Sequence, residues 1–121
     1  MNYEKILKKL KIVVLNDGDY KDLLDKLYKI NVIGFDKNTI GFGGNIQGIP
    51  FIFLHEEYNT SDKDYQRIYI AHEAAHAIGC ILNEEEADKW ALDALNETQQ
   101  NILKNEWPFR HGHKYHEMEE K

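Results

Sequence analysis

The sequence predicts a small α+β domain, and three observations lead to this fold class. The chain has 121 residues, a length that supports one hydrophobic core. Apolar residues at helical spacing occur before residue 30 and after residue 60, whereas the segment between them is rich in β-branched and aromatic residues. We therefore expect a single compact domain over residues 1–121, with residues 108–121 as a candidate tail. Its core would be a twisted, mainly antiparallel sheet of three or four strands, packed on two consecutive helices.

The first thirty residues predict two helices on either side of one strand. Residues 2–10 carry apolar side chains at helical spacing, with lysines on the opposite face. Lys11–Leu15 is a short, β-branched run that favours a strand, and the polar residues 16–19 favour a turn. Helical spacing resumes at Tyr20, so we expect Asp19 to be the N-cap of a second helix.

The middle segment, residues 30–55, predicts two or three antiparallel strands with tight turns. Glycines separate its β-branched and aromatic residues, and the segment ends in the apolar run Ile49–Leu54. Pro50 has no amide donor, which favours an edge strand, or the start of a strand, for this last run.

Two more helices are expected after residue 60. Ser61 and Asp64 have the spacing of a capping box, and the helical pattern that follows ends near residue 79. Asn83 and Glu86 have the same spacing and open the next helix. The pattern leaves open whether this helix continues towards Pro108 or a new one begins at Asn96.

Charge and composition exclude several function classes. The chain has 15 Lys and Arg against 21 Asp and Glu, a net charge of −6, which disfavours nucleic acid as the main partner. Its longest apolar runs are far shorter than the roughly 20 residues that span a bilayer. A single cysteine, Cys80, cannot form an internal disulfide, and we expect it to be buried. These features predict a soluble cytoplasmic protein with no membrane partner, and they do not indicate an oligomeric state.

The segment His72-Glu73-Ala74-Ala75-His76 has the pattern H-E-x-x-H. Residues four apart on a helix project from one face, so both imidazoles can reach one Zn²⁺ ion at roughly 2.0–2.1 Å. Glu73 is offset by about a quarter turn, where a carboxylate can act on water without binding the metal. The alternative is two histidines that are merely exposed on a helix.

A third ligand would decide the class of zinc site. Residues 72–79 begin like the metzincin signature, but that signature requires a histidine where this chain has Leu82. Glu84 could complete a His₂Glu set, and Asp88, four residues later on the same helix face, could accept the remaining N–H of a ligand histidine. Glu85 is the alternative ligand. An acidic first turn that complements the helix dipole is the structural alternative for these glutamates.

Ile68-Tyr69-Ile70-Ala71-His72-Glu73-Ala74-Ala75-His76, followed by Glu84-x-x-Ala87-Asp88-x-Trp90-Ala91, resembles the gluzincin zinc peptidases, most closely their compact ImmA/IrrE-type and minigluzincin branches. The resemblance covers roughly residues 49–95. It implies zinc ligation by His72, His76 and Glu84, with Glu73 as general base and acid. It also implies an active cleft under a small antiparallel sheet. The Leu-Leu-x-Pro ending common in the ImmA/IrrE branch is absent.

These observations predict a metalloendopeptidase with one Zn²⁺ ion. Its substrate would be an extended peptide laid along the presumed edge strand Ile49–Leu54. The candidate donors to the oxyanion of the reaction are Tyr69, Arg110, His111 and Tyr115. A catalytically silent, zinc-stabilised module that binds a peptide or protein is the alternative, and an interaction protein without metal is a second one.

The C-terminal tail contains three of the six histidines: His111, His113 and His116. The simpler interpretation is a solvated tail with some affinity for metals. The sharper hypothesis is latency, as in a zymogen, in which one tail imidazole takes the open zinc position until the tail is removed.

Overall fold

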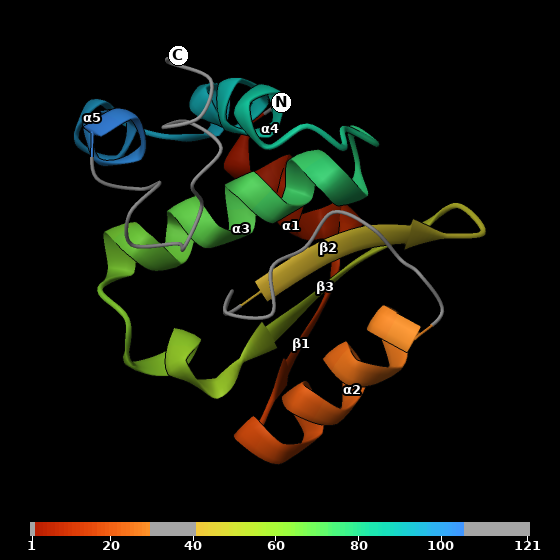
Figure 1. Cartoon of the computed structure of the whole chain (residues 1–121). Helices are drawn as coiled ribbons and strands as arrows, with labels where there is room; N and C mark the ends of the chain where they lie inside the picture. Colours follow the sequence, from red (N-terminus) through yellow and green to blue (C-terminus); the bar gives the residue numbers. More distant parts are fainter. Residues whose placement is uncertain (1, 30–40, 106–121) are drawn as a thin grey trace, which may run out of the picture.

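The computed structural model describes residues 2–29 and 41–105 and confirms the predicted α+β class (Figure 1). The first half of the described chain contains two helices and all three strands of the sheet, and the second half is helical. None of the described helices is both long enough and apolar enough to cross a membrane. In chain order the elements are α1 (Tyr3–Lys9), β1 (Lys11–Leu15), α2 (Asp17–Lys29), β2 (Gly41–Ile46), β3 (Ile49–His55), the 3₁₀ helix η1 (Glu56–Thr60), α3 (Lys63–Ala77), α4 (Glu84–Ala91), the 3₁₀ helix η2 (Leu92–Ala94) and α5 (Glu97–Asn105).

The sheet has three strands in the order β1-β3-β2 and is mixed. β2 and β3 form an antiparallel hairpin, in which Gly43 lies opposite Ile52. β1 runs parallel to β3, with Val13 opposite Phe53, so the expectation of a mainly antiparallel sheet holds for the hairpin alone. The chain passes through α2 and β2 between these two strands, and a connection of this length permits parallel pairing.

β3 is the central strand, so the prediction of an edge strand at Ile49–Leu54 is wrong. The pairing with β1 begins at Phe51, opposite Lys11. Pro50 lies just before that pairing begins and is opposite Asn45 of β2. A proline is therefore compatible with a central strand here, because its missing amide donor lies beyond the end of β1.

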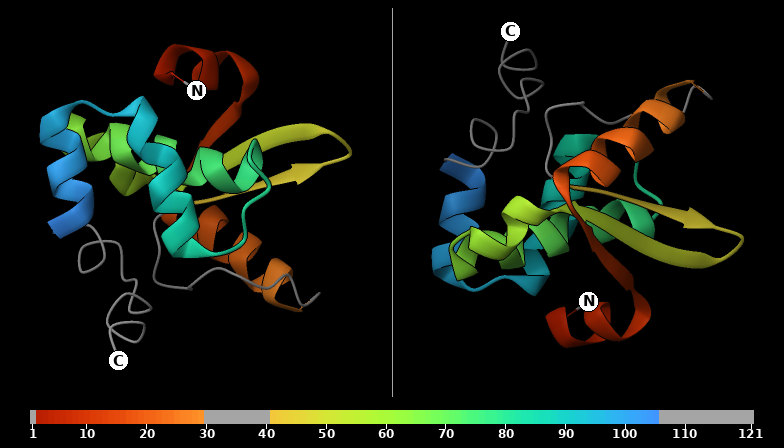
Figure 2. Two further views of the ribbon diagram at one scale, coloured as in Figure 1. Left: turned by 90° about the horizontal axis from the view of Figure 1, so that it is seen from above. Right: turned by 90° about the horizontal axis from the view of Figure 1, so that it is seen from below.

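The two faces of β3 pack against different helices (Figures 1 and 2). Ile52 and Leu54 are fully buried and belong to the main core, which also contains residues of α1, α3, η2 and α5. Phe51 and Phe53 point to the other face and pack with Tyr20 of α2, which is buried. α4 and α5 lie on the side of α3 that faces away from the sheet. This arrangement buries α3 on several sides and makes it the centre of the fold.

Helices α2 and α3 begin with other N-cap residues than the sequence predicts. The side chain of Asn16 accepts from the backbone N–H of Asp19 at 2.8 Å, so Asn16 caps α2 and Asp19 lies in its first turn. Asp62, rather than Ser61, is the N-cap of α3. In both cases several neighbouring residues are good caps, and the sequence alone does not rank them.

The starts of the last two helices are clearer. Asn83 accepts from the backbone N–H of Glu86 at 2.9 Å and caps α4 as predicted. Asn96 and Gln99 exchange hydrogen bonds between their side chains and backbone N–H groups, which forms a reciprocal cap at α5. The helical pattern therefore restarts at Asn96 rather than continuing from α4.

Candidate metal centre

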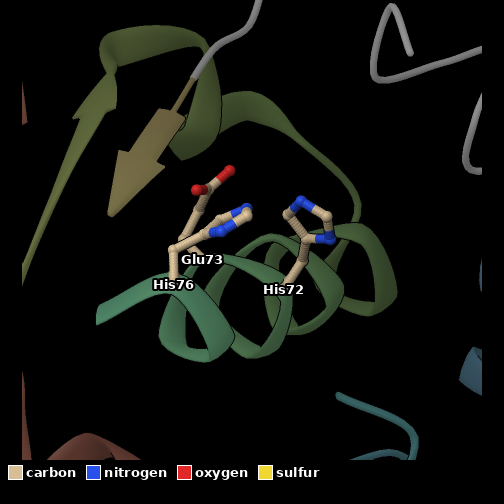
Figure 3. Close-up of side chains that lie close together, drawn as sticks. All are labelled: His72, Glu73 and His76. Carbon is tan, nitrogen blue, oxygen red and sulfur yellow. The ribbon is translucent and has the colours of Figure 1, made fainter. Parts of the chain in front are cut away.

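Three side chains of the H-E-x-x-H segment project from the C-terminal half of α3 (Figure 3). His72 is fully buried and Glu73 is 3% exposed, whereas His76 is partly exposed. The two imidazoles lie nearly perpendicular to each other, with ring centroids 5.1 Å apart. Ligand atoms of His72, Glu73 and His76 all lie within 4.8 Å of one another, so this group could hold a metal ion.

The first turn of α4 brings Glu84 to both imidazoles. Its Oε2 atom lies 2.8 Å from Nε2 of His72 and 3.0 Å from Nε2 of His76. Two ligands of a tetrahedral zinc ion lie about 3.3 Å apart, given bonds of roughly 2.0–2.1 Å. A shift of a few tenths of an ångström would therefore open these contacts to the spacing of a zinc site. The donor set of two imidazoles and one carboxylate fits the ion.

The neighbouring glutamate does not take part. Glu85 is 40% exposed at its side chain and pairs with Lys89 at 3.7 Å, one turn along α4. Of the two ligand candidates that the sequence offered, the structure brings Glu84 to the histidines.

The other nitrogen of each imidazole is bonded to a fixed acceptor. Nδ1 of His72 lies 2.6 Å from Oδ1 of Asp88, the residue expected to orient a ligand histidine. Nδ1 of His76 lies 2.5 Å from the backbone carbonyl oxygen of Ile81. In the metal-free protein each Nε2 donates to Glu84. Once a metal ion displaces that proton, donation from Nδ1 leaves the lone pair of Nε2 directed at the ion.

The Ile81 carbonyl depends on the turn that joins α3 to α4. Cys80 has a φ of +54°, in the left-handed region that side chains other than glycine rarely adopt. It is also exposed, so the expectation of a buried cysteine is wrong. This turn directs the Ile81 carbonyl back towards α3, a backbone contact that the residue pattern does not signal.

The charges around the site are strongly coupled. Burial alone would lower the pKa of His72, but its hydrogen bonds to Asp88 and Glu84 raise that pKa well above the usual value. Burial would also lower the pKa of His76, but its hydrogen bond to Glu84 raises that pKa above the usual value. Burial would raise the pKa of Glu84, yet both imidazoles hold it well below the usual range. In the metal-free protein, the histidines therefore hold protons that a metal ion would have to displace.

Glycines of β2 let the sheet approach α3 beside Glu73. A Cβ atom on Gly43 would overlap the backbone carbonyl oxygen of Glu73, and one on Gly41 would lie 3.8 Å from its Cγ atom. The carboxylate of Glu73 points towards β2 (Figure 3). In the sequence these glycines indicate turns, and their role in helix–sheet packing becomes visible only in three dimensions.

The remaining candidates are either in the core or outside the described residues. Tyr69 is 8% exposed and belongs to the main core, one turn before Glu73 on α3. His55 has a structural role, because its Nε2 lies 2.8 Å from Oδ1 of Asp17 and its Nδ1 accepts from the backbone N–H of Glu57. The tail candidates all lie outside the described residues: Arg110, His111, His113, Tyr115 and His116.

None of the models of known protein families matches the sequence, and no curated protein or solved structure matches it either. The interpretation of the site therefore rests on its geometry and its donor atoms.

Proposed function

We propose that this protein is a zinc-dependent metalloendopeptidase of the gluzincin type, with one Zn²⁺ ion held by His72, His76 and Glu84. One observation carries the proposal: two Nε2 atoms converge on a single carboxylate oxygen, at 2.8 and 3.0 Å. Their Nδ1 atoms are engaged by Asp88 and by a backbone carbonyl, which is the support that ligand histidines usually have.

The donor set favours a catalytic site over a structural one. Structural zinc sites have four protein ligands, commonly including cysteines, whereas catalytic sites have three and leave one position open. The only cysteine, Cys80, is exposed and in the turn beside the site rather than among the converging atoms. Glu73 is the remaining carboxylate of the cluster, and its role decides between a catalytic and a closed site.

We assign Glu73 the part of general base and acid. A bound zinc ion supplies Lewis acidity towards a peptide carbonyl and towards water. Glu73 accepts a proton from the attacking water at its carboxylate and then passes it to the leaving amine. Its packing between α3 and β2 fixes the direction of that carboxylate, because Gly43 brings the strand against the Glu73 backbone.

The proposed substrate is a peptide in extended conformation. β3 is central and cannot accept it, so the proposal moves the docking strand to β2, which within the described residues pairs with β3 alone. A peptide that adds to the outer side of β2 would run close to Glu73, because β2 packs on α3 at this residue.

Two further parts of the proposal come from the sequence. The histidine-rich tail would keep the enzyme latent through one of its imidazoles. The cytoplasm is the proposed location, since the chain has a single cysteine and makes no use of internal disulfides.

The substitution Glu73→Gln tests the assignment, with Glu85→Gln as a matched control on an exposed glutamate. Zinc content is measured on the purified proteins, and cleavage is measured on casein as an unfolded substrate, with and without a chelator. We expect about one zinc ion per chain in all three proteins and a rate that falls by roughly 10²–10⁴ in Glu73→Gln alone.

Each other outcome has a definite meaning. Loss of zinc in Glu73→Gln would show that Glu73 is a ligand and would contradict the peptidase mechanism. Zinc without cleavage, both in the full chain and in a chain that ends at Trp107, would favour the silent binding module. Absence of zinc from the wild-type protein after incubation with the ion would refute the metal site itself.

A further inference from the structure

Strand β1 forms an exposed apolar edge of the sheet. Along one side it pairs with β3, and among the described residues no strand pairs with its other side. Three consecutive side chains of this strand are exposed by 36–40%: Ile12, Val13 and Val14. β3 separates β1 from β2, the strand that packs on α3 beside Glu73, so this edge is separate from the candidate metal centre.

The edge lacks the features that usually protect an outer strand. Monomeric proteins block such edges with proline, bulges or charged residues within the strand. β1 has the sequence KIVVL and pairs without interruption from Lys11 to Leu15. Its one charged residue, Lys11, is at the first position. The remaining four residues have the β-branched and apolar side chains that favour strand pairing.

We propose that β1 pairs with β1 of a second copy of this chain, antiparallel and centred on Val13. Val13 would lie opposite Val13 of the second copy, Ile12 opposite Val14, and Lys11 opposite Leu15. The two three-stranded sheets would then join into one continuous sheet of six strands. Such an interface is isologous, so it closes with two copies and does not propagate into a fibre.

The distribution of charge favours an antiparallel second copy over other partners. Basic residues cluster at the N-terminal end of β1, at Lys8, Lys9 and Lys11. Acidic residues cluster at its C-terminal end, where the Asp17 backbone N–H donates to the Glu56 carboxylate at 2.5 Å. Antiparallel pairing brings the basic end of one copy to the acidic end of the other at both ends of the interface. Parallel pairing would bring like charges together.

The symmetry of this pairing also places the metal centres. A two-fold axis through a pair of antiparallel strands is perpendicular to the sheet, so α3 of both copies would lie on the same face. The two β2 strands would be five strand spacings apart, about 24 Å. The dimer would therefore present two sites on one side without either site contributing a residue to the other.

Sedimentation of the full chain tests the association. We expect a concentration-dependent dimer, and we expect Val13→Lys to weaken the dimer by at least tenfold, because like charges would face each other across the axis. Ile46→Lys is the matched control, since Ile46 is 60% exposed but lies on β2. Circular dichroism establishes that both variants are folded. A wild-type protein that stays monomeric at all concentrations would overturn the proposal.

Cross-linking tests the register. In a Cys80→Ser background, Val13→Cys would face itself across the axis with Cα atoms about 4.5–5.5 Å apart, within reach of a disulfide. Ile12→Cys would face itself only diagonally, at roughly 7–8 Å, which is too far. We expect rapid disulfide formation in Val13→Cys alone. Equal rates for Val13→Cys, Ile12→Cys and Ile46→Cys would indicate random collision and would overturn the proposal.

Discussion

Replacing Asp88 with asparagine tests the support of the metal centre most directly. Asp88 is 7% exposed, and its Oδ1 atom lies 2.6 Å from Nδ1 of His72. Asparagine keeps the size and one acceptor oxygen but removes the negative charge that makes the imidazole a stronger ligand. Loss of such a partner usually weakens metal binding 10- to 100-fold, or about 1.4–2.7 kcal/mol. Competition with a coloured chelator at pH 8.5 measures this change directly.

The pH dependence of the variant sharpens the test. Asp88 is one of three carboxylates that raise the pKa of His72, together with Glu84 and Glu73, so this pKa should fall in Asp88→Asn. A proton then competes less with the metal, and the difference in affinity between variant and wild type should shrink as the pH falls from 8.5 to 6. For the wild type, zinc binding near pH 7 should release protons into the buffer. A folded Asp88→Asn protein that binds zinc within twofold of wild type at pH 8.5 would refute the assigned role.

Three further predictions concern the backbone around the site and the tail. Gly43→Ala should lower the free energy of unfolding by about 1–3 kcal/mol, because its Cβ would overlap the Glu73 carbonyl. In the first turn of α2, the added Cβ of Gly18→Ala would meet only an ordinary contact at 3.5 Å, so this change should raise the free energy of unfolding by about 0.5 kcal/mol. Urea titrations measure both variants, and equal effects of the two substitutions would contradict the prediction. Cys80→Gly should raise the free energy of unfolding by about 1 kcal/mol, because glycine adopts the positive φ at this position without strain. Cys80→Val should lower both the free energy of unfolding and the affinity for zinc. A chain that ends at Trp107 should cleave casein faster than the full chain, and an unchanged rate would count against latency.

The donors of the candidate centre were largely predictable because they depend on short spacings. His72 and His76 are one helical turn apart, and the cap at Asn83 starts α4 so that Glu84 is in its first turn. Asp88 follows on the same face of that helix. Each of these relations extends over only a few residues, so local periodicity was sufficient.

The backbone contacts of the site were not predictable in the same way. The carbonyl of Ile81 carries no side-chain signal, and its direction depends on the left-handed conformation at Cys80. The contact between Gly43 and Glu73 joins two elements whose relative placement is set by the sheet. Such contacts depend on the tertiary arrangement, which a linear pattern does not encode.

The placement of Ile49–Leu54 at the edge of the sheet was the main error of the sequence prediction. The composition of residues 49–55 is typical of a strand. The sign that it lies inside the fold is that its apolar residues occupy both faces. Phe51 and Phe53 pack towards α2, and Ile52 and Leu54 towards α3. The proline at position 50 suggested an edge strand because it has no amide donor. The sequence does not show that β1, a strand from the distant N-terminal segment, pairs with β3 only from Phe51 onwards, so that this donor is not needed.

The donors of the candidate metal centre are also close together along the chain, which affects how the site assembles. Glu84 is 12 positions from His72 and only eight from His76, whereas the Asp17–His55 contact joins residues 38 positions apart. Closing a short loop costs less conformational entropy than closing a long one. If the site binds a metal ion as proposed, a larger part of the binding energy is therefore left to hold α4 against α3, and the ion should stabilise this pair of helices rather than join remote parts of the molecule.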